Sequence, residues 1–136
     1  MVVMTSLLMN ANELDCGASP STPPSSDFAA VQAIFDAHCV SCHSAALTPG
    51  VLGYPQLPLT AGQSYAALVG RPAHEVCGGT LVTAGNAGAS YLEAKLTQIQ
   101  PCEGARMPTG EAILPQPLSQ ADLDTITGWI SAGAPD

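Results

Sequence analysis

The clearest chemical pattern in the chain is five consecutive residues, Cys39-Val40-Ser41-Cys42-His43. Two thiols at this spacing can add to the two vinyl groups of haem as thioethers. A histidine directly after the second cysteine can then place an imidazole nitrogen under the iron. The pattern therefore predicts covalent attachment of one haem c at Cys39 and Cys42, with His43 as an axial iron ligand.

Three other interpretations of these residues remain open. The pattern can arise by chance in a chain with five cysteines and three histidines. A redox-active Cys-x-x-Cys pair usually follows a β-strand in a βαβ unit, whereas this pair follows a predicted helix in a chain with little strand signal. A structural zinc site could use Cys39, Cys42, Cys77 and Cys102. Such sites usually supply their ligands as two close pairs, but Cys77 and Cys102 lie far apart in the sequence.

The position opposite His43 has one leading candidate, Met107. A methionine thioether is a common partner of a haem histidine. Three of the four methionines lie within the first nine residues, so Met107 alone belongs to the predicted folded part of the chain. Pro108 follows it and restricts the backbone before it. The alternatives are that Met107 fills a gap in the core, or that His74 is the ligand.

The two distant cysteines, Cys77 and Cys102, are predicted to form a disulfide if the close pair holds a haem. Such a bond indicates an oxidising compartment and would contribute a few kcal/mol by closing a loop. Two free buried thiols are the alternative.

Some other polar residues could contact a haem or serve ordinary structural roles. His38 is expected to be a helix-end residue, favourably placed near the negative end of the helix dipole. Five further residues could each hydrogen-bond a haem propionate or could be ordinary surface or core residues. They are Tyr54, Tyr65, Arg71, Arg106 and Trp129.

Composition limits the classes of protein to which the chain can belong. Its 136 residues are enough for one domain, and its net charge is −8 with three Lys and Arg residues in total. Nucleic acids and anionic membranes need clusters of basic residues, so the composition argues against both as partners. The acidic surface suits a basic docking partner, or solubility alone. Aromatic residues make up only 4% of the chain, and a large flat cofactor could help to complete so small a core.

The first 26 residues are predicted to be a leader and a flexible tether. Residues 1–9 are mostly apolar, Cys16 follows, and residues 17–26 are rich in Ser, Pro and Gly. This order is similar to that of bacterial lipoproteins, in which the cysteine is lipidated, although a basic segment at the start is missing. No stretch is long enough to cross a bilayer as a helix. We expect a periplasmic or otherwise extracytoplasmic protein, with a possible lipid anchor at Cys16 and a folded domain over residues 27–136.

Hydrophobic periodicity in that domain predicts four helices separated by long loops. Asp27 and Ser119 are predicted to cap the first and last helices, with Asp122 completing a capping box. The first helix is expected to run from Phe28 to about His38. Each of these two helices is predicted to have one apolar face, formed by Phe28, Val31, Ile34 and Phe35 in the first and by Leu123, Ile126, Trp129 and Ile130 in the last. A short helix is expected at residues 63–69, and Ser90 is predicted to cap a third helix that runs to about Ile99. Residues 73–89 could form a turn or two short strands, and the fold class is all-α.

The chain resembles the class I cytochrome c family, most closely its small bacterial monohaem domains. The matching segments are the attachment box at residues 39–43, residues 90–96, Arg106-Met107-Pro108 and the tail at residues 118–135. The resemblance implies an all-α fold with the first and last helices packed together, long loops wrapping one haem, and the haem edge partly exposed. It assigns thioether bonds to Cys39 and Cys42 and axial ligation to His43 and Met107. The chain departs from the simplest members in its long loop after the attachment box and in its extra Cys77/Cys102 pair.

The expected function is electron transfer rather than catalysis, since both axial positions of the iron would be filled by protein. Redox partner proteins are the expected partners. One alternative is a haem c relay domain fixed in a larger oxidoreductase. Another is a haem sensor or enzyme with an open sixth position, and a third is a zinc-stabilised interaction module.

Overall fold

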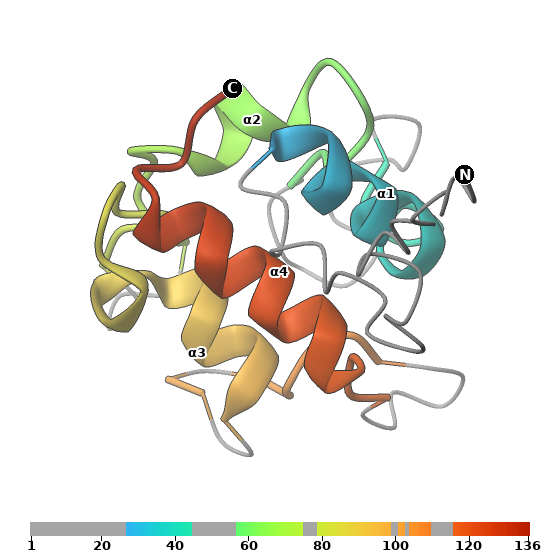
Figure 1. Cartoon of the computed structure of the whole chain (residues 1–136). Coiled ribbons are helices and arrows are strands. Elements are labelled where there is room, and N and C mark those ends of the chain that lie inside the picture. The colour runs from blue at the N-terminus through green and yellow to red at the C-terminus, as the bar shows by residue number, and fades with distance from the viewer. Residues whose placement is uncertain (1–26, 45–56, 75–78, 99–100, 103, 110–115) are drawn as a thin grey trace, which may run out of the picture.

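The computed structural model describes residues 27–44, 57–74, 79–98, 101–102, 104–109 and 116–136. Figure 1 shows the long helix α4 crossing the molecule, with α3 beside it and α1 and α2 nearby. The helices, in chain order, are α1 (Phe28–His38), α2 (Ser64–Leu68), the short 3-10 helix η2 (Ala87–Ala89), α3 (Tyr91–Thr97) and α4 (Gln120–Ser131).

The starts of α1 and α4 follow the capping chemistry predicted from the sequence. The Asp27 carboxylate accepts a hydrogen bond from the backbone N–H of Ala29 at 3.1 Å. The Ser119 hydroxyl accepts one from the backbone N–H of Asp122 at 3.2 Å. Each bond satisfies one of the N–H groups that the first helical turn leaves without a helical partner. Both predicted caps are therefore confirmed.

Helix α3 differs from its prediction at both ends. Ser90 precedes the helix, but its side chain makes no capping hydrogen bond. Instead its buried hydroxyl accepts from the backbone N–H of Thr83 at 2.9 Å and donates to the carbonyl of Asn86 at 2.8 Å. The helix ends at Thr97, two residues before the predicted end at Ile99, which lies outside the described residues. Ser90 therefore anchors the preceding turn to α3 rather than capping α3.

The hydrophobic core lies where α1 and α3 pack against α4. The buried residues of α1 and α4 include those predicted to share an apolar face, namely Val31, Ile34, Phe35, Leu123, Ile126, Trp129 and Ile130. The Phe28 and Trp129 rings lie with their centroids 5.2 Å apart, and Tyr65 of α2 packs edge-on against Phe28 at 5.2 Å. Three of the six aromatic side chains of the chain thus meet at one contact between α1, α2 and α4.

The C-terminal end of α4 folds back on the core. Gly133 adopts φ +104°, and its N–H donates to the carbonyl of Ile130, while the N–H of Ala134 donates to the carbonyl of Trp129. These bonds form the Schellman arrangement, which favours glycine at this position. The turn places the Pro135 carbonyl 2.8 Å from the Trp129 indole nitrogen, which donates to it. The buried indole N–H therefore has its partner.

The chain between α2 and α3 is only loosely paired. Isolated bridges join Val69 to Val82 and Pro72 to Thr80, and the N–H of Leu81 donates to the carbonyl of Arg71 at 2.7 Å. The sequence predicts a turn or two short strands for residues 73–89; the described residues of that segment form no strand and contain bridged residues at Thr80 and Val82, followed by η2.

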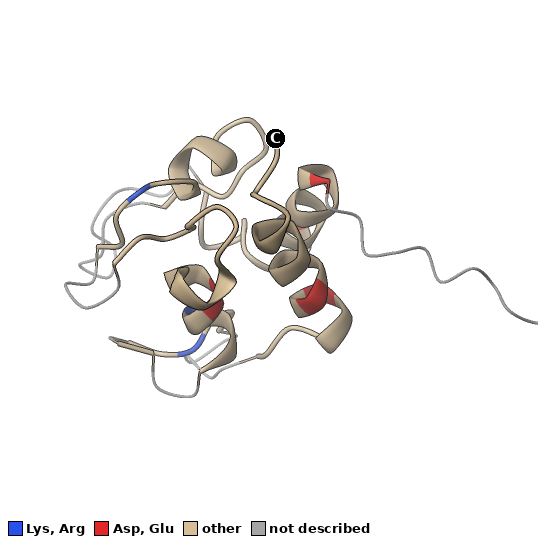
Figure 2. Ribbon diagram, turned by 60° about the vertical axis from the view of Figure 1, so that its left-hand side comes forward, with Lys and Arg blue, Asp and Glu red and all other residues tan. Residues whose placement is uncertain are grey.

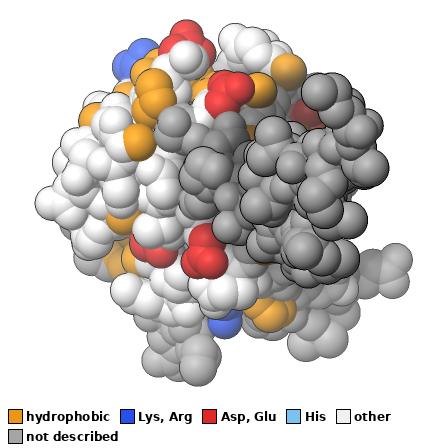
Figure 3. Space-filling model, in the orientation of Figure 1, with side chains coloured by type: hydrophobic (Ala, Val, Ile, Leu, Met, Phe, Trp, Pro, Cys, Tyr) orange, Lys and Arg blue, Asp and Glu red, His pale blue; other side chains and the backbone are white. Residues whose placement is uncertain are grey.

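Charged residues are spread over the described surface. Figure 2 shows acidic positions on α1, α3 and α4, and Figure 3 shows acidic side chains scattered over the face formed by α3 and α4. Arg106 donates to the carbonyl of Leu96 in α3, the helix that also carries Lys95. Arg71 instead donates to the carbonyl of Ala66 in α2. In the described part of the chain, no helix has the length and apolar character needed to cross a membrane.

The packing of α4 yields a stability prediction. Ile126 is fully buried, so Ile126→Ala should lower the free energy of unfolding by about 2–5 kcal/mol through lost burial and a residual cavity. The exposed residue Asp124 on the same helix provides the control, because Asp124→Asn should change stability by less than about 0.5 kcal/mol. Denaturant unfolding at matched cofactor content measures both. Equal effects of the two variants would contradict the core described here.

Candidate functional site

The attachment box forms one compact turn at the C-terminal end of α1. Cys39 is the residue that ends the helix, and its N–H donates to the carbonyl of Phe35 at 2.8 Å. The N–H groups of Cys42 and His43 both donate to the Cys39 carbonyl, at 3.1 and 2.8 Å. Both thiols are free. Cys39 is half-buried and packs against the core, whereas Cys42 is exposed. The two thiols and the imidazole are therefore presented by a single turn that a rigid helix holds.

The environment of Cys39 keeps its thiol protonated. Burial and, to a smaller extent, the neighbouring Cys42 together raise the pKa of the Cys39 thiol to about 11. Redox-active Cys-x-x-Cys pairs instead have a lowered pKa and often lie at a helix N-terminus. Here the pair lies at a helix C-terminus, whose negative dipole end disfavours a thiolate. The site does not fit the redox-active interpretation.

The zinc interpretation also finds little support. Cys102, one of its four proposed ligands, is disulfide-bonded, so its sulfur is not a thiolate ligand. Cys77, the predicted disulfide partner, lies outside the described residues, as does Cys16. Within the ranges described above, no group of three or more His, Cys, Asp or Glu side chains is gathered to hold a metal ion.

His43 is oriented through both its backbone and its ring. The N–H of Leu59 donates to the His43 carbonyl at 2.8 Å, and the imidazole donates a hydrogen bond to the backbone carbonyl of Leu57. Burial lowers the pKa of His43, the bond to Leu57 opposes this shift, and the positive charge of Lys95 adds to it. A neutral imidazole that donates from one ring nitrogen keeps a lone pair on the other, which is the state of a metal-binding histidine.

Leu57 is a functional residue that sequence reasoning missed. It contributes a backbone carbonyl, a group that every residue carries, so no side-chain pattern singles it out. The only local signal is Pro58, which favours an extended backbone at the residue before it.

Met107 and His43 lie near the same residue of α3. Met107 is half-buried and packs against the core, and its N–H donates to the Lys95 carbonyl at 2.8 Å. The Lys95 ammonium is close enough to His43 to lower its pKa. The peptide bond between Met107 and Pro108 is cis. Met107 and His43 are thus each related to Lys95, Met107 by a backbone hydrogen bond and His43 by the electrostatic effect of the ammonium.

The other candidate side chains are engaged elsewhere or exposed. His74 is exposed, and the His38 ring nitrogen lies 3.8 Å from the Asp122 carboxylate. Four of the five proposed propionate contacts donate to backbone carbonyls, namely Tyr65 to Ala134, Arg71 to Ala66, Arg106 to Leu96 and Trp129 to Pro135. Tyr54 lies outside the described residues.

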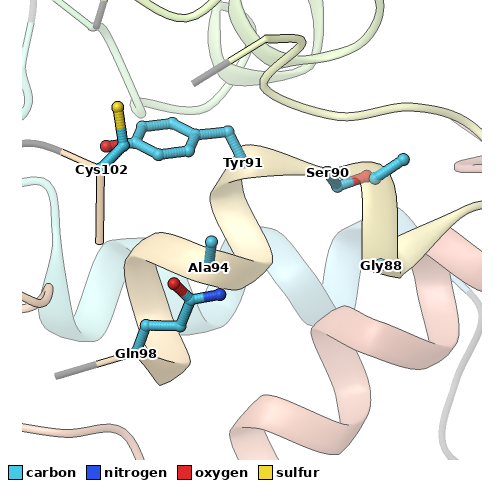
Figure 4. A pocket seen from close by; sticks show the side chains of 7 residues that line it. Gly88, Ser90, Tyr91, Ala94, Gln98 and Cys102 are labelled. Atoms are coloured by element: carbon cyan, nitrogen blue, oxygen red, sulfur yellow. The ribbon is translucent and has the colours of Figure 1, made fainter. Parts of the chain in front are cut away.

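Two hollows on the described surface can be compared with the site. One, of about 240 Å³, lies beside α3 and is shown in Figure 4, where Tyr91 and Cys102 lie at the same end of it. The other, of about 500 Å³, lies between α1 and α2 and has Gln32 and Tyr65 in its lining. Neither is lined by the attachment turn or by Met107. The fit of this chain to a haem therefore rests on its donors: two free thiols, a neutral imidazole with a lone pair, and a thioether, all of which are groups that bind haem c.

Comparison with known proteins gives no family model, no curated protein and no solved structure that matches the chain. The candidate site therefore depends on its own residues and geometry.

The raised thiol pKa of Cys39 yields a prediction about reactivity. In the haem-free Cys42→Ser variant, alkylation of Cys39 by iodoacetamide near pH 8 should be slower than for an ordinary thiol, by up to about 100-fold. Removing Cys42 also removes the smaller cause of the shift, so this is an upper limit. Mass spectrometry across a pH series gives the rate, and the same variant in denaturant provides the ordinary thiol. A reactive thiolate that titrates near pH 7 would contradict the site described here.

Proposed function

We propose that this chain is a small c-type cytochrome that carries one haem c and transfers single electrons. The observation that carries the proposal is the attachment turn, in which two free thiols at haem spacing are followed by His43, whose ring N–H is held by the Leu57 carbonyl. A haem bound here supplies an iron that changes reversibly by one electron.

Each protein group has a distinct role in this proposal. Cys39 and Cys42 anchor the cofactor, since each S–H adds across a vinyl group and forms a thioether. His43 and Met107 fill the two axial positions, so that no substrate reaches the metal, and the chain is a carrier rather than an enzyme. A Met ligand raises the reduction potential. Leu57 fixes which nitrogen of His43 carries the proton and how its ring is oriented.

The proposed fold is that of a class I cytochrome c, all-α with its first and last helices packed together. The contact between α1 and α4 supports this proposal, as does the position of the attachment turn directly after α1.

The proposed partners are redox proteins with a basic docking surface. The net charge of −8 and the scattered carboxylates support this, and they argue against nucleic acid. The disulfide at Cys102 supports an oxidising compartment, such as the periplasm. A lipid anchor at Cys16 would tether the domain to a membrane surface. A relay domain within a larger oxidoreductase and a haem protein with an open sixth position remain alternative functions.

An optical and near-infrared spectrum tests the proposal. The chain should be expressed with a c-type maturation system and then examined in its oxidised and reduced states. We expect sharp reduced haem c bands, together with the weak oxidised near-infrared band of a Met–iron bond. Haem that denaturing extraction does not remove would establish the thioether bonds. A chain that takes up no haem under these conditions would exclude the proposal.

Substitutions assign the individual roles. Cys39→Ala or Cys42→Ala should each remove one thioether, and His43→Ala should abolish stable haem attachment or low-spin ligation. Met107→Ala should keep the covalent haem, lose the near-infrared band, allow carbon monoxide to bind and lower the potential. The exposed His74→Ala variant is the control and should match the unsubstituted protein. If the unsubstituted protein lacks the near-infrared band, and carbon monoxide binds the His74→Ala variant but not the Met107→Ala variant, the sixth ligand is reassigned to His74.

A further inference from the structure

Segment 57–60 connects α1 and α2 to the attachment turn. It contacts the turn twice, because the N–H of Leu59 donates to the His43 carbonyl at 2.8 Å and the Leu57 carbonyl accepts from the His43 ring. It contacts α2 through the Thr60 carbonyl, which accepts from the N–H of Ser64 at 3.1 Å. The position of the carbonyl that orients His43 therefore depends on what holds this segment.

Gln32 of α1 is the side chain that holds it. Its amide nitrogen donates to the Leu59 carbonyl at 3.0 Å and to the Asp36 carboxylate at 2.8 Å. Its amide oxygen accepts a short hydrogen bond from the Ser64 hydroxyl. Ser64 is fully buried, so its hydroxyl needs a protein partner, and the amide of Gln32 supplies one. The two side chains thus form one network that joins α1, α2 and segment 57–60.

We propose that Gln32 and Ser64 are positioning residues for the axial histidine, acting through segment 57–60 to fix the Leu57 carbonyl against the His43 ring. This inference rests on the proposed function, since it concerns the ligand properties of His43. Neither residue lies beside the attachment box in the sequence, and neither carries the chemistry of the cofactor. Gln32 and Ser64 act on His43 through the backbone carbonyls of Leu59 and Leu57.

The network has a defined effect on the iron. A hydrogen bond from the ring N–H to a carbonyl makes the imidazole a stronger donor, and a stronger donor favours the oxidised metal. Displacing the Leu57 carbonyl should therefore weaken His43 as a ligand and raise the reduction potential. It should also expose the ring N–H to water, so that this proton exchanges faster.

The experiment uses the haem-loaded protein and its Gln32→Leu variant, which keeps the size of the side chain but removes the amide. We expect the ring N–H of His43, observed by NMR in the oxidised protein, to exchange about fivefold to tenfold faster, the equivalent of one lost hydrogen bond. The reduction potential should rise while the haem c bands and the Met–iron band are retained. A role limited to stability would leave both the exchange rate and the potential unchanged.

Gln120 of α4 offers a matched control. It donates to Asp124 four residues later at 2.8 Å, as Gln32 does to Asp36, and it is exposed. The Gln120→Leu variant should therefore leave the exchange rate and the potential unchanged. An equal response in both variants would overturn the inference.

Ser64→Ala is the second test, and it decides the question if Gln32→Leu fails to fold. The exchange rate and the reduction potential should change in the same direction as in Gln32→Leu, but by less, because Gln32 keeps its own bond to Leu59. The double variant should shift no further than Gln32→Leu alone, since the two residues act as a unit. Normal haem bands with an unchanged exchange rate and potential would overturn the inference and leave the proposed function standing. Absence of haem from the unsubstituted protein would instead remove the proposed function.

Discussion

Helix α1 is fixed by the apolar face that it packs against α4, and the candidate site depends on this contact. Val31, Ile34 and Phe35 are buried there, and Phe28 adds a ring contact with the fully buried Trp129. Gln32 is half-buried and lies one helical turn after Phe28, at the border of this apolar face, and the end of α1 carries the attachment turn. A shift of α1 on α4 would therefore move the thiols and the support of His43 together. The burial of apolar side chains is not directional, so it does not by itself orient the site. Hydrogen bonds from α1 position the site relative to the buried face.

The local electrostatics keep the Cys39 thiol protonated and the His43 imidazole neutral, and do not activate either group for catalysis. The thiols lie at the negative end of a helix dipole, and the pKa of Cys39 is raised by its burial. The pKa of His43 is lowered by burial, so the ring is neutral at pH 7. Sites for nucleophilic catalysis show the reverse arrangement, with thiols made acidic by positive partners. A site that keeps Cys39 protonated and His43 neutral suits the proposed function, in which the iron keeps both of its protein ligands while it changes its charge.

The sequence predicts the helices better than it predicts the contacts that refine the site. Asp27 and Ser119 act locally, through the first turn of the helix that follows, so their roles follow from sequence. Ser90 also precedes a helix, as Ser119 does, but its buried hydroxyl instead bonds Thr83 and Asn86 of the preceding turn. Residue spacing does not predict that hydrogen bonds to another part of the fold will replace a helix cap.

The support of His43 is hidden from the sequence for a related reason. It consists of backbone carbonyls at Leu57 and Leu59 and of an amide on another helix, Gln32, whose partner Ser64 belongs to a third segment. The five-residue attachment box, in contrast, carries its chemistry in side chains at fixed spacing. The sequence therefore indicates the donors and the helices that carry them, but not the network that orients them.

The order of the elements along the chain has a consequence for assembly. The attachment turn directly follows α1, whereas the helix that covers the apolar face of α1 is the last of those described. During synthesis, Cys39 and Cys42 therefore emerge long before α4 exists to complete the core. Until α4 is made, the apolar face of α1 lacks its partner, so the turn that carries the two thiols is not yet held by the finished core. Under the proposed function, the chain order leaves a period in which haem can be joined to the polypeptide before the core is complete.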